Sequence, residues 1–356
     1  INGIKAGYEA GMKVIHIPDT IEINDDIRRL TSVVCHSLSD VPDIIDTWNE
    51  GKVADVEGYY ENAKINRVYV DRVHVKKAFA EYTAAYNADD PKIKLKIDHT
   101  YRVAALCEKI ADSVGLTGED KDVAWLLGML HDIGRFEQIK RYNTFSDADS
   151  VDHAKFGADL LFKDGLISTF LNGMVKCTGY KPGTLEDRYS SDGVFLYDRL
   201  NKSDMEMLEL AIRCHNMYRI PQGLNSREQA FCNVLRDADK VDIFKVNIDT
   251  PLEEIYNTTT EELMKSDITD EVLEAFDEEH CILKAIRRTP ADTVIGHVSL
   301  AYELVYDESV RITVEQGYLA KLMHFHSDNE ETNRKMAMVR EKMDSYVKKR
   351  IGKKDA

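Results

Sequence analysis

The sequence has no long apolar segment, no paired-cysteine pattern and no low-complexity tract. No hydrophobic run in its 356 residues approaches the roughly 20 residues that a membrane-spanning helix needs. The six cysteines are scattered without CxxC spacing, which argues against a zinc knuckle and a disulfide framework. No signal peptide is recognisable at the start. These absences favour a soluble protein in the reducing cytoplasm, without a membrane partner.

Basic residues are the minority among the charged side chains. The 47 lysines and arginines stand against 63 aspartates and glutamates, which gives a formal net charge of -16. A broad surface for a nucleic-acid polymer has to neutralise many phosphates at once, so this balance disfavours such a partner. A small anionic substrate remains compatible, because a local cationic pocket can lie on an acidic protein. The hydrophobic content of 43% is ample for a buried core.

The first 50 residues alternate between helical and strand-like segments, which indicates a partial α/β unit with parallel strands. The run from Asn2 to Gly7, followed by Gly11 to Asp19, resembles the end of a haloacid-dehalogenase superfamily phosphatase or phosphosugar mutase. The nucleophilic aspartate, the phosphate-binding lysine and the acidic motif of that family would lie upstream of this segment. We therefore expect the sequence to begin inside a domain and residues 1–50 to be an inactive remnant.

The pattern becomes helical from Val75 onward, and its central feature is the adjacent pair His131 and Asp132 at the end of an apolar helix. At about 100° per residue, His131 lies on the buried face of that helix. In the preceding helix, which we expect to begin near Lys94, His99 shares one stripe with apolar residues at helical spacing. A buried imidazole beside a buried carboxylate implies either a satisfied hydrogen-bonded pair or a metal site.

Further histidines and aspartates lie on or beside the apolar stripes of other helical segments. His153 opens a helix after a polar loop, and His215 follows a helix rich in leucine and methionine. Near the end of a later helix, the helical wheel places Asp239 about 40° from Leu235 on the apolar face. Asp237 lies about 200° away from that position, and Asp242 also points inward as a second candidate.

The number of these residues matters more than any one of them. An isolated buried histidine is more often a hydrogen-bonded core residue than a ligand. Converging imidazoles and carboxylates, however, supply the nitrogen and oxygen ligands that suit Mn, Fe, Co, Ni or Zn ions. The candidate ligands are His99, His131, Asp132, His153, His215 and Asp239.

The order of His99, then His131 with Asp132, then Asp239 resembles the H…HD…D pattern of the HD-domain metal-dependent phosphohydrolases. The resemblance covers about residues 75–250, and it implies an all-α helical bundle. It also implies that these four residues hold one divalent metal ion, that Asp132 bridges, and that His153 and His215 complete a second site, with Mg²⁺ also compatible. A Gly-Tyr-Pro motif does not accompany the site, which argues against cyclic-di-GMP hydrolysis.

Four residues near the ligands are candidates for the reaction itself. Asp132 is the first, because the resemblance implies that it bridges two metal ions. Two ions about 3.5–4 Å apart can clamp a phosphoryl oxygen and hold a hydroxide for in-line attack. Arg135, whose planar fork suits phosphate oxygens, and Lys240 are expected to contact the phosphate. For Lys240 a balancing role toward neighbouring carboxylates is an equal alternative. Asp237 is a candidate proton acceptor or partner of a ligand histidine.

We therefore predict a mainly α, cytoplasmic, metal-dependent phosphohydrolase whose substrate is a small phosphorylated, nucleotide-like molecule. Two alternatives stay open, namely a di-iron oxygenase on the same fold and a non-catalytic nucleotide-binding regulatory module. The sequence leaves the oligomeric state open. The predicted organisation is a partial α/β segment (1–50), a linker (51–74), the HD domain (75–250) and a C-terminal helical extension that packs on the HD domain (251–356).

Overall fold

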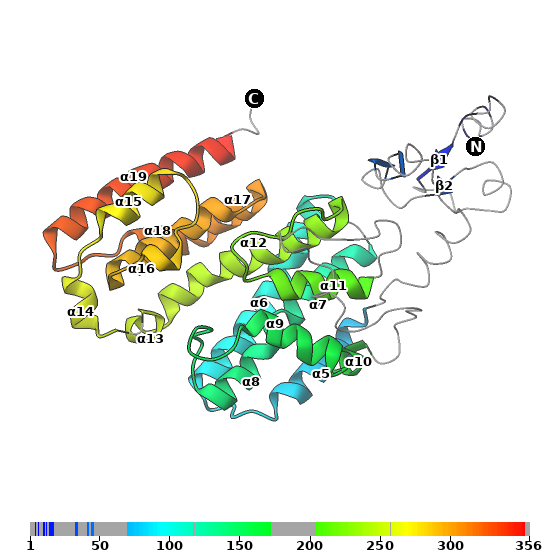
Figure 1. Ribbon diagram of the computed structural model, residues 1–356, viewed down its shortest axis with the longest axis horizontal. Helices are drawn as coiled ribbons and strands as arrows, with labels where there is room; N and C mark the ends of the chain where they lie inside the picture. Colours follow the sequence, from blue (N-terminus) through cyan, green and yellow to red (C-terminus); the bar gives the residue numbers. More distant parts are fainter. Residues whose placement is uncertain are drawn as a thin grey trace. The chain divides into compact units, whose positions relative to one another are not determined.

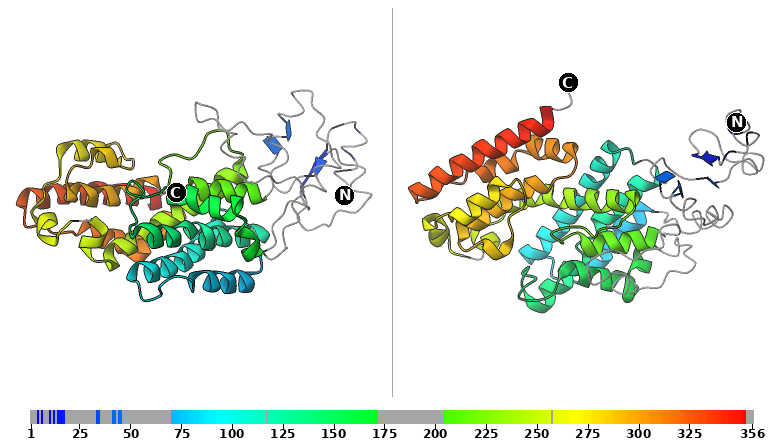
Figure 2. Two further views of the ribbon diagram at one scale, coloured as in Figure 1. Left: turned by 60° about the horizontal axis from the view of Figure 1, so that its bottom comes forward. Right: turned by 45° about the horizontal axis from the view of Figure 1, so that its top comes forward.

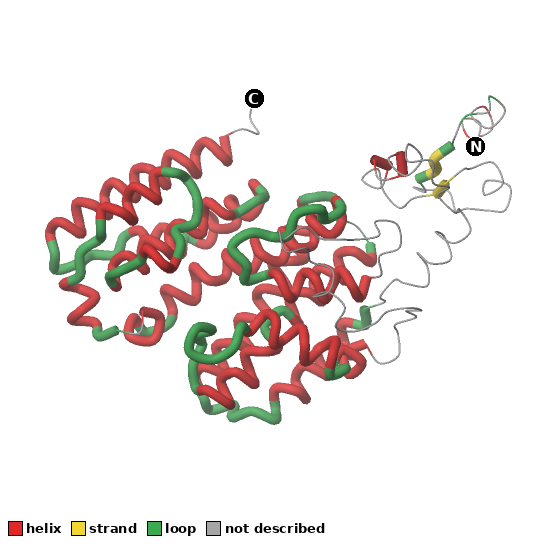
Figure 3. Tube along the Cα trace, viewed as in Figure 1, coloured by secondary structure: helices red, strands yellow, loops and turns green. Residues whose placement is uncertain are grey.

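The computed structural model is mainly α-helical, which confirms the predicted fold class (Figures 1 and 3). It describes residues 70–116, 118–171, 204–256 and 258–352, together with scattered positions between 4 and 45. Among these described residues, no helix is both long and apolar enough to cross a lipid bilayer. The four described cysteines, Cys107, Cys214, Cys232 and Cys281, are all buried and unbridged.

Two short strands occur near the N-terminus. Strand β1 (Ile15–His16) pairs in parallel with β2 (Val33–Val34), with Ile15 opposite Val33. This pairing agrees with the parallel α/β unit that the alternating segments predict. Most of the dehalogenase-like run and residues 51–69 of the predicted linker lie outside the described residues.

The chain divides into two compact units, each built from two separate stretches of sequence. Unit 1 comprises Ile1–Ala85 and Ile133–Cys232, and unit 2 comprises Tyr86–Asp132 and Asn233–Ala356. The predicted domain boundaries stay a prediction.

The helices of unit 1 are short and pack against one another. They are α5 (Arg72–Thr83), α8 (Ile133–Tyr142), α9 (His153–Ala158), a π-helical turn η2 (Asp159–Lys163), α10 (Ile167–Leu171), α11 (Asp204–Cys214) and the first residues of α12 (Ser226–Asp249). Helix α9 packs against both α8 and α11, while α5 packs against α10. Edge-to-face contacts of Phe136 with Phe79 and Tyr82, at 5.9 Å between ring centroids, join α5 to α8.

The crossing of α8 and α9 depends on two glycines. A Cβ atom added at Gly134 would lie 2.5 Å from the carbonyl oxygen of His153 and 2.7 Å from the backbone nitrogen of Gly157. Only glycine permits backbones to approach this closely without displacing one of them. The position of His153 at the start of α9 is therefore set by a backbone contact with α8.

Unit 2 holds the long helices α6 and α19, most of α12, and a series of shorter helices. They are α6 (Pro91–Ser113), α7 (Glu119–Leu130), the rest of α12, α13 (Leu252–Tyr256), α14 (Thr260–Lys265), α15 (Asp270–Asp277), η4 (Lys284–Ile286), α16 (Pro290–Val298), η5 (Ser299–Glu303), α17 (Asp307–Gln316), α18 (Tyr318–Met323) and α19 (Glu330–Ile351). In Figure 2, α19 runs along the other C-terminal helices, and it contacts α15, α17 and α18.

Local sequence signals explain where α6 begins and how α7 meets it. Asp90 caps α6 by accepting a hydrogen bond from the backbone N–H of Lys92, and Pro91 occupies the first turn. A Cβ atom at Gly128 of α7 would lie 2.4 Å from the Cα atom of Ala104 on α6. The two helices therefore pack backbone to backbone at this point. The predicted apolar stripe that includes His99 is buried, and its other members are Val103, Leu106 and Ile110.

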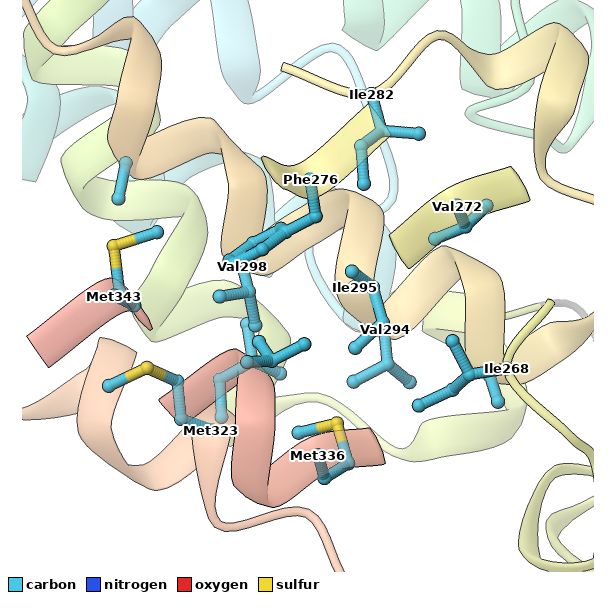
Figure 4. Close-up of a cluster of buried hydrophobic side chains, with 14 of the residues drawn as sticks. Ile268, Val272, Phe276, Ile282, Val294, Ile295, Val298, Met323, Met336 and Met343 are labelled. Atoms are coloured by element: carbon cyan, nitrogen blue, oxygen red, sulfur yellow. The ribbon is translucent and has the colours of Figure 1, made fainter. Parts of the chain in front are cut away.

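A hydrophobic cluster within unit 2 joins the helices after residue 250 to one another. Phe276 of α15 lies at its centre with Val298 of α16, and Met336 and Met343 of α19 cover one side (Figure 4). Burial of these apolar side chains provides the main stabilisation of the C-terminal helices, at roughly 25 cal/mol per Å² of apolar surface.

Candidate metal centre

Helices α6 and α7 bring His99 and His131 face to face. Both side chains are buried, and their Nε2 atoms are 3.3 Å apart. The close packing at Gly128 is responsible, because His131 lies one turn after this glycine and His99 lies more than one turn before Ala104. The predicted placement of both histidines on buried helix faces is confirmed.

Two carboxylates complete this cluster. One oxygen of Asp132, Oδ2, lies 3.5 Å from the Nε2 atom of His99 and 3.6 Å from that of His131. Asp239 on α12 places its Oδ1 atom 3.2 Å and 3.7 Å from the same two nitrogens. The structure therefore brings together the four predicted residues of unit 2, from two separate parts of the sequence.

The Nδ1 atoms of both histidines are engaged on the far sides of the rings. His131 donates from Nδ1 to the carbonyl oxygen of Gly128 at 2.8 Å, and His99 donates to Oδ2 of Asp242 at 2.6 Å. Arg102 holds Asp242 through two bonds of 2.6 and 2.9 Å. With their protons on Nδ1, both neutral rings direct lone pairs on Nε2 toward Asp132 and Asp239.

The electrostatics of this cluster favour a cation. Burial disfavours the ionised form of Asp239, but hydrogen bonds and positive charge from His131 and His99, when these rings also carry a proton on Nε2, outweigh burial and hold the pKa of Asp239 well below its usual value. Burial and the Lys96 ammonium disfavour protonation of His99, but Asp239 and Asp242 raise the pKa of this histidine. Positive charge between these groups is therefore stabilised, whether it is carried by a proton or by a metal ion.

A second histidine pair lies in unit 1 and has the same construction. The Nε2 atoms of His153 and His215 are 3.1 Å apart. His215 donates from Nδ1 to the carbonyl oxygen of Ile212 at 2.7 Å, and His153 donates to Oδ2 of Asp147 at 2.6 Å. Both Nε2 atoms again carry lone pairs that face each other, so this pair also offers two nitrogen ligands to a cation.

Arg135, which we predicted to contact a phosphate, organises the loop that supports His153. Its Nη1 atom donates to Oδ1 of Asp147 at 3.0 Å and to the carbonyl oxygen of Phe145 at 2.7 Å. Although partial burial raises the pKa of Asp147, the hydrogen bond from His153 and the charge of Arg135 lower it below the usual range. Arg135 thus supports His153 through Asp147, and its predicted contact with a phosphate stays a prediction.

Other polar side chains support the same loop. Gln138 donates to Asp147 at 3.0 Å and to the Ser150 hydroxyl at 2.9 Å. Asn216, next to His215, donates to Oδ1 of Asp152 at 2.9 Å. Asp147, Asp152 and His153 each have a ligand atom within 4.8 Å of the others. Asp152 also caps α9 by accepting from the backbone N–H of Lys155, which explains its place directly before His153.

The reaction roles predicted for Asp237 and Lys240 stay predictions, and both side chains are buried in α12. The Asp237 carboxylate accepts hydrogen bonds of 3.0 Å from the backbone N–H groups of Val305 and Tyr306. The carboxylate that contacts the Nδ1 atom of His99 is that of Asp242. The Lys240 ammonium is buried and donates to the carbonyl oxygen of Arg236; burial, and next the Arg236 charge, lower its pKa to about 8. Both side chains belong to the buried side of α12 that faces the C-terminal helices.

Three supporting residues were not among the predicted site residues. Lys96 contacts Asp132, Arg102 orients Asp242, and Asp147 orients His153. The spacing of Lys96, three residues before His99 on one helix face, was the only signal for the first of these. Asp147 lies in an irregular loop, where periodicity gives no signal.

The donor set fits a divalent transition-metal ion in both clusters. Each histidine presents Nε2 with its proton on Nδ1, and carboxylate oxygens complete the first cluster. Imidazole nitrogens with carboxylate oxygens suit Mn, Fe, Co, Ni and Zn, and hydrogen-bonded Nδ1 atoms are a regular feature of metal-binding histidines.

Comparison with known proteins agrees with this assignment. The family model described as "HD domain" matches residues 97–244, a range that includes His99, His131, Asp132 and Asp239. Neither the curated proteins nor the solved structures gave a match to the chain. The family match, on residues that the structure gathers into one buried His and Asp cluster, supports an HD-domain protein.

Proposed function

We propose that this chain hydrolyses phosphoester bonds in a reaction that depends on divalent metal ions. The observation that carries the proposal is the cluster of His99, His131, Asp132 and Asp239, in which both Nε2 atoms face carboxylate oxygens. The match of residues 97–244 to the HD domain supports the same class of activity.

Two ions would be held, one by this cluster and one by His153 and His215. When bound, such ions polarise phosphoryl oxygens and lower the pKa of a coordinated water. The protein's part is to fix the ligands, which Asp242 and Arg102 do for His99, and which Asp147 and Arg135 do for His153.

The proposed substrate is a small phosphorylated molecule of nucleotide, dinucleotide or phosphomonoester type. The chain carries a net charge of -16, so we expect it to bind an anion through the local metal sites and not through an extended basic surface. The assignment to nucleotides follows the family resemblance, because nothing in the described clusters selects a base.

The test is phosphate release from a panel of nucleotides, dinucleotides and phosphomonoesters with added Mn²⁺, Fe²⁺, Co²⁺, Ni²⁺ or Mg²⁺. We expect turnover in the wild type and in Asp112→Ala, a control on the exposed side of α6, and its loss in Asp132→Ala. Absence of turnover with every metal, in folded and metal-loaded protein, would overturn the proposal for this panel. Oxygen consumption by the iron-loaded protein without phosphate release would favour the di-iron oxygenase instead.

A further inference from the structure

Lys96 contacts the candidate metal cluster of unit 2 from its edge. It lies on α6 three residues before His99, and its Nζ atom is 2.6 Å from Oδ2 of Asp132. The Lys96 side chain is 15% exposed, whereas that of Asp132 is only 3% exposed. Lys96 therefore connects a buried carboxylate to the solvent-accessible edge of the cluster.

The contact is made to the oxygen of Asp132 that also faces both histidines. Oδ2 of Asp132 lies 3.5 Å from Nε2 of His99 and 3.6 Å from Nε2 of His131. A buried carboxylate is costly without a compensating charge, and the ammonium of Lys96 supplies it here. A divalent ion held by the two Nε2 atoms would share this oxygen with Lys96, and the two cations would repel each other.

We propose that Lys96 is an internal counter-ion of Asp132 that couples metal binding to the binding of a phosphate group. Without phosphate, the ammonium competes with the metal ion for Asp132 and weakens metal binding. With phosphate, Lys96 binds a phosphate oxygen and releases Asp132 to the metal. The inference rests on the proposed function, because it requires a metal ion at His99 and His131.

The chemistry of lysine suits this exchange. An ammonium on a flexible four-carbon stem can move between two oxygen partners, whereas a planar guanidinium is held in a fork of fixed geometry. Phosphate oxygens are strong acceptors of charge-assisted hydrogen bonds, so the ammonium gains a partner as it leaves the carboxylate.

Coupling between two ligands is reciprocal, which makes the proposal measurable in equilibrium binding without any turnover. In the wild type we expect phosphate to tighten Mn²⁺ binding by a factor of about 5 to 150, the usual range for coupled sites. In Lys96→Met the competing charge is absent. Mn²⁺ should therefore bind about tenfold more tightly than in the wild type without phosphate, and phosphate should change its affinity little.

The experiment is a titration with Mn²⁺, followed through the paramagnetic resonance signal of the free ion, with and without inorganic phosphate. It uses the His215→Ala background so that the unit 1 pair does not contribute a second site. Lys94→Met is the matched control, since Lys94 is an exposed lysine on the same helix. Lys96→Arg keeps the charge, so we expect weak Mn²⁺ binding without phosphate to persist in it.

Each outcome has a separate meaning. If Lys96→Met binds Mn²⁺ no more tightly than the background protein without phosphate, or keeps the full effect of phosphate, the coupling role of Lys96 is wrong. If Lys96→Met does not fold, Lys96→Arg decides the question. A change from weak to tight Mn²⁺ binding without phosphate in Lys96→Arg would contradict the coupling role of Lys96. If the background protein binds no Mn²⁺ at all, the metal site of the proposed function fails, and the inference fails with it.

Discussion

The two histidine pairs of this protein are built on one plan in two different units. In each pair the Nε2 atoms face each other, at 3.3 Å in unit 2 and 3.1 Å in unit 1. In each, one Nδ1 atom donates to a carboxylate at 2.6 Å, and the other donates to a carbonyl three residues earlier. An arginine holds the carboxylate in both cases.

The pairs differ in the charges that surround the Nε2 atoms. In unit 2, Asp132 and Asp239 lie within 3.7 Å of both Nε2 atoms of the pair. In unit 1, the carboxylate nearest to the pair, Asp147, is engaged by the Nδ1 atom of His153 and by Arg135. The comparison indicates that the unit 2 pair binds a cation more tightly, because opposite charge adjoins the ligand atoms.

The largest expected effect separates the pairs by removing one histidine at a time. We expect His131→Ala to abolish the tighter Mn²⁺ site and His215→Ala to abolish the weaker one, each leaving the other in place. Phosphoester turnover should fall by more than ~100-fold in both, since loss of a ligand exceeds the loss of a supporting residue. Metal analysis after equilibrium dialysis measures the first effect. Loss of both sites in either variant would contradict independent pairs.

A smaller effect is expected from the carboxylates that orient the histidines. Asp242→Asn and Asp147→Asn keep an acceptor near Nδ1 but remove its charge, so Mn²⁺ affinity at the corresponding pair should fall by about 10–100-fold. The matched controls are Asp249→Asn and Asp149→Asn. Asp249 forms an exposed ion pair with Lys245, and Asp149 lies exposed in the polar loop. Unchanged Kd values in Asp242→Asn and Asp147→Asn would show that ring orientation does not depend on these carboxylates.

The glycines beside the two pairs should matter for stability. Gly128→Ala places a Cβ atom against Ala104 in unit 2, and Gly134→Ala places one against the carbonyl oxygen of His153 in unit 1. Each should lower the free energy of unfolding by about 1–3 kcal/mol, because rigid backbone has to move. Urea denaturation measures this, and Ala105→Ser on the exposed side of α6 should stay within about 0.5 kcal/mol of the wild type. A wild-type midpoint in both glycine variants would show that the backbones are not in close contact.

The last effect concerns His297 of α16, a histidine whose charged neighbours are cations. Burial, together with Arg287 and Lys284, lowers its pKa from 6.5 to about 3. The unfolded chain therefore binds the proton more readily, so stability is complete above pH 6.5 and is lost as the pH falls toward 3. Between pH 7.5 and 5 this histidine should cost about 2 kcal/mol of unfolding free energy.

Urea denaturation at both pH values tests the prediction for His297. The variant His297→Gln has no titrating group at this position and should lose correspondingly less stability than the wild type on acidification. Equal losses in the two proteins would mean that His297 is not held neutral by the fold. His297 thereby sharpens the comparison, because His99 and His153 have carboxylate partners where His297 has cations.

The helical periodicity was sufficient to place His99 and His131 on buried faces and Asp239 on the inward side of α12. It was also sufficient for the mainly α fold class. These features depend on the spacing of apolar residues within one helix, and this spacing is visible in the sequence. The same argument placed Asp237 on the side of α12 away from Asp239, but it did not show that the segment at Val305 covers this side.

The sequence by itself determined which helix faces carry His99, His131 and Asp239. Only the tertiary structure decided which side chains contact and orient these histidines and carboxylates. Asp242 reaches His99 across 143 positions of sequence and Lys96 reaches Asp132 across 36, while Arg135 turns to Asp147. The physical reason is that periodicity describes one helix at a time. Contacts between helices depend instead on how closely the backbones approach, as Gly128 and Gly134 allow.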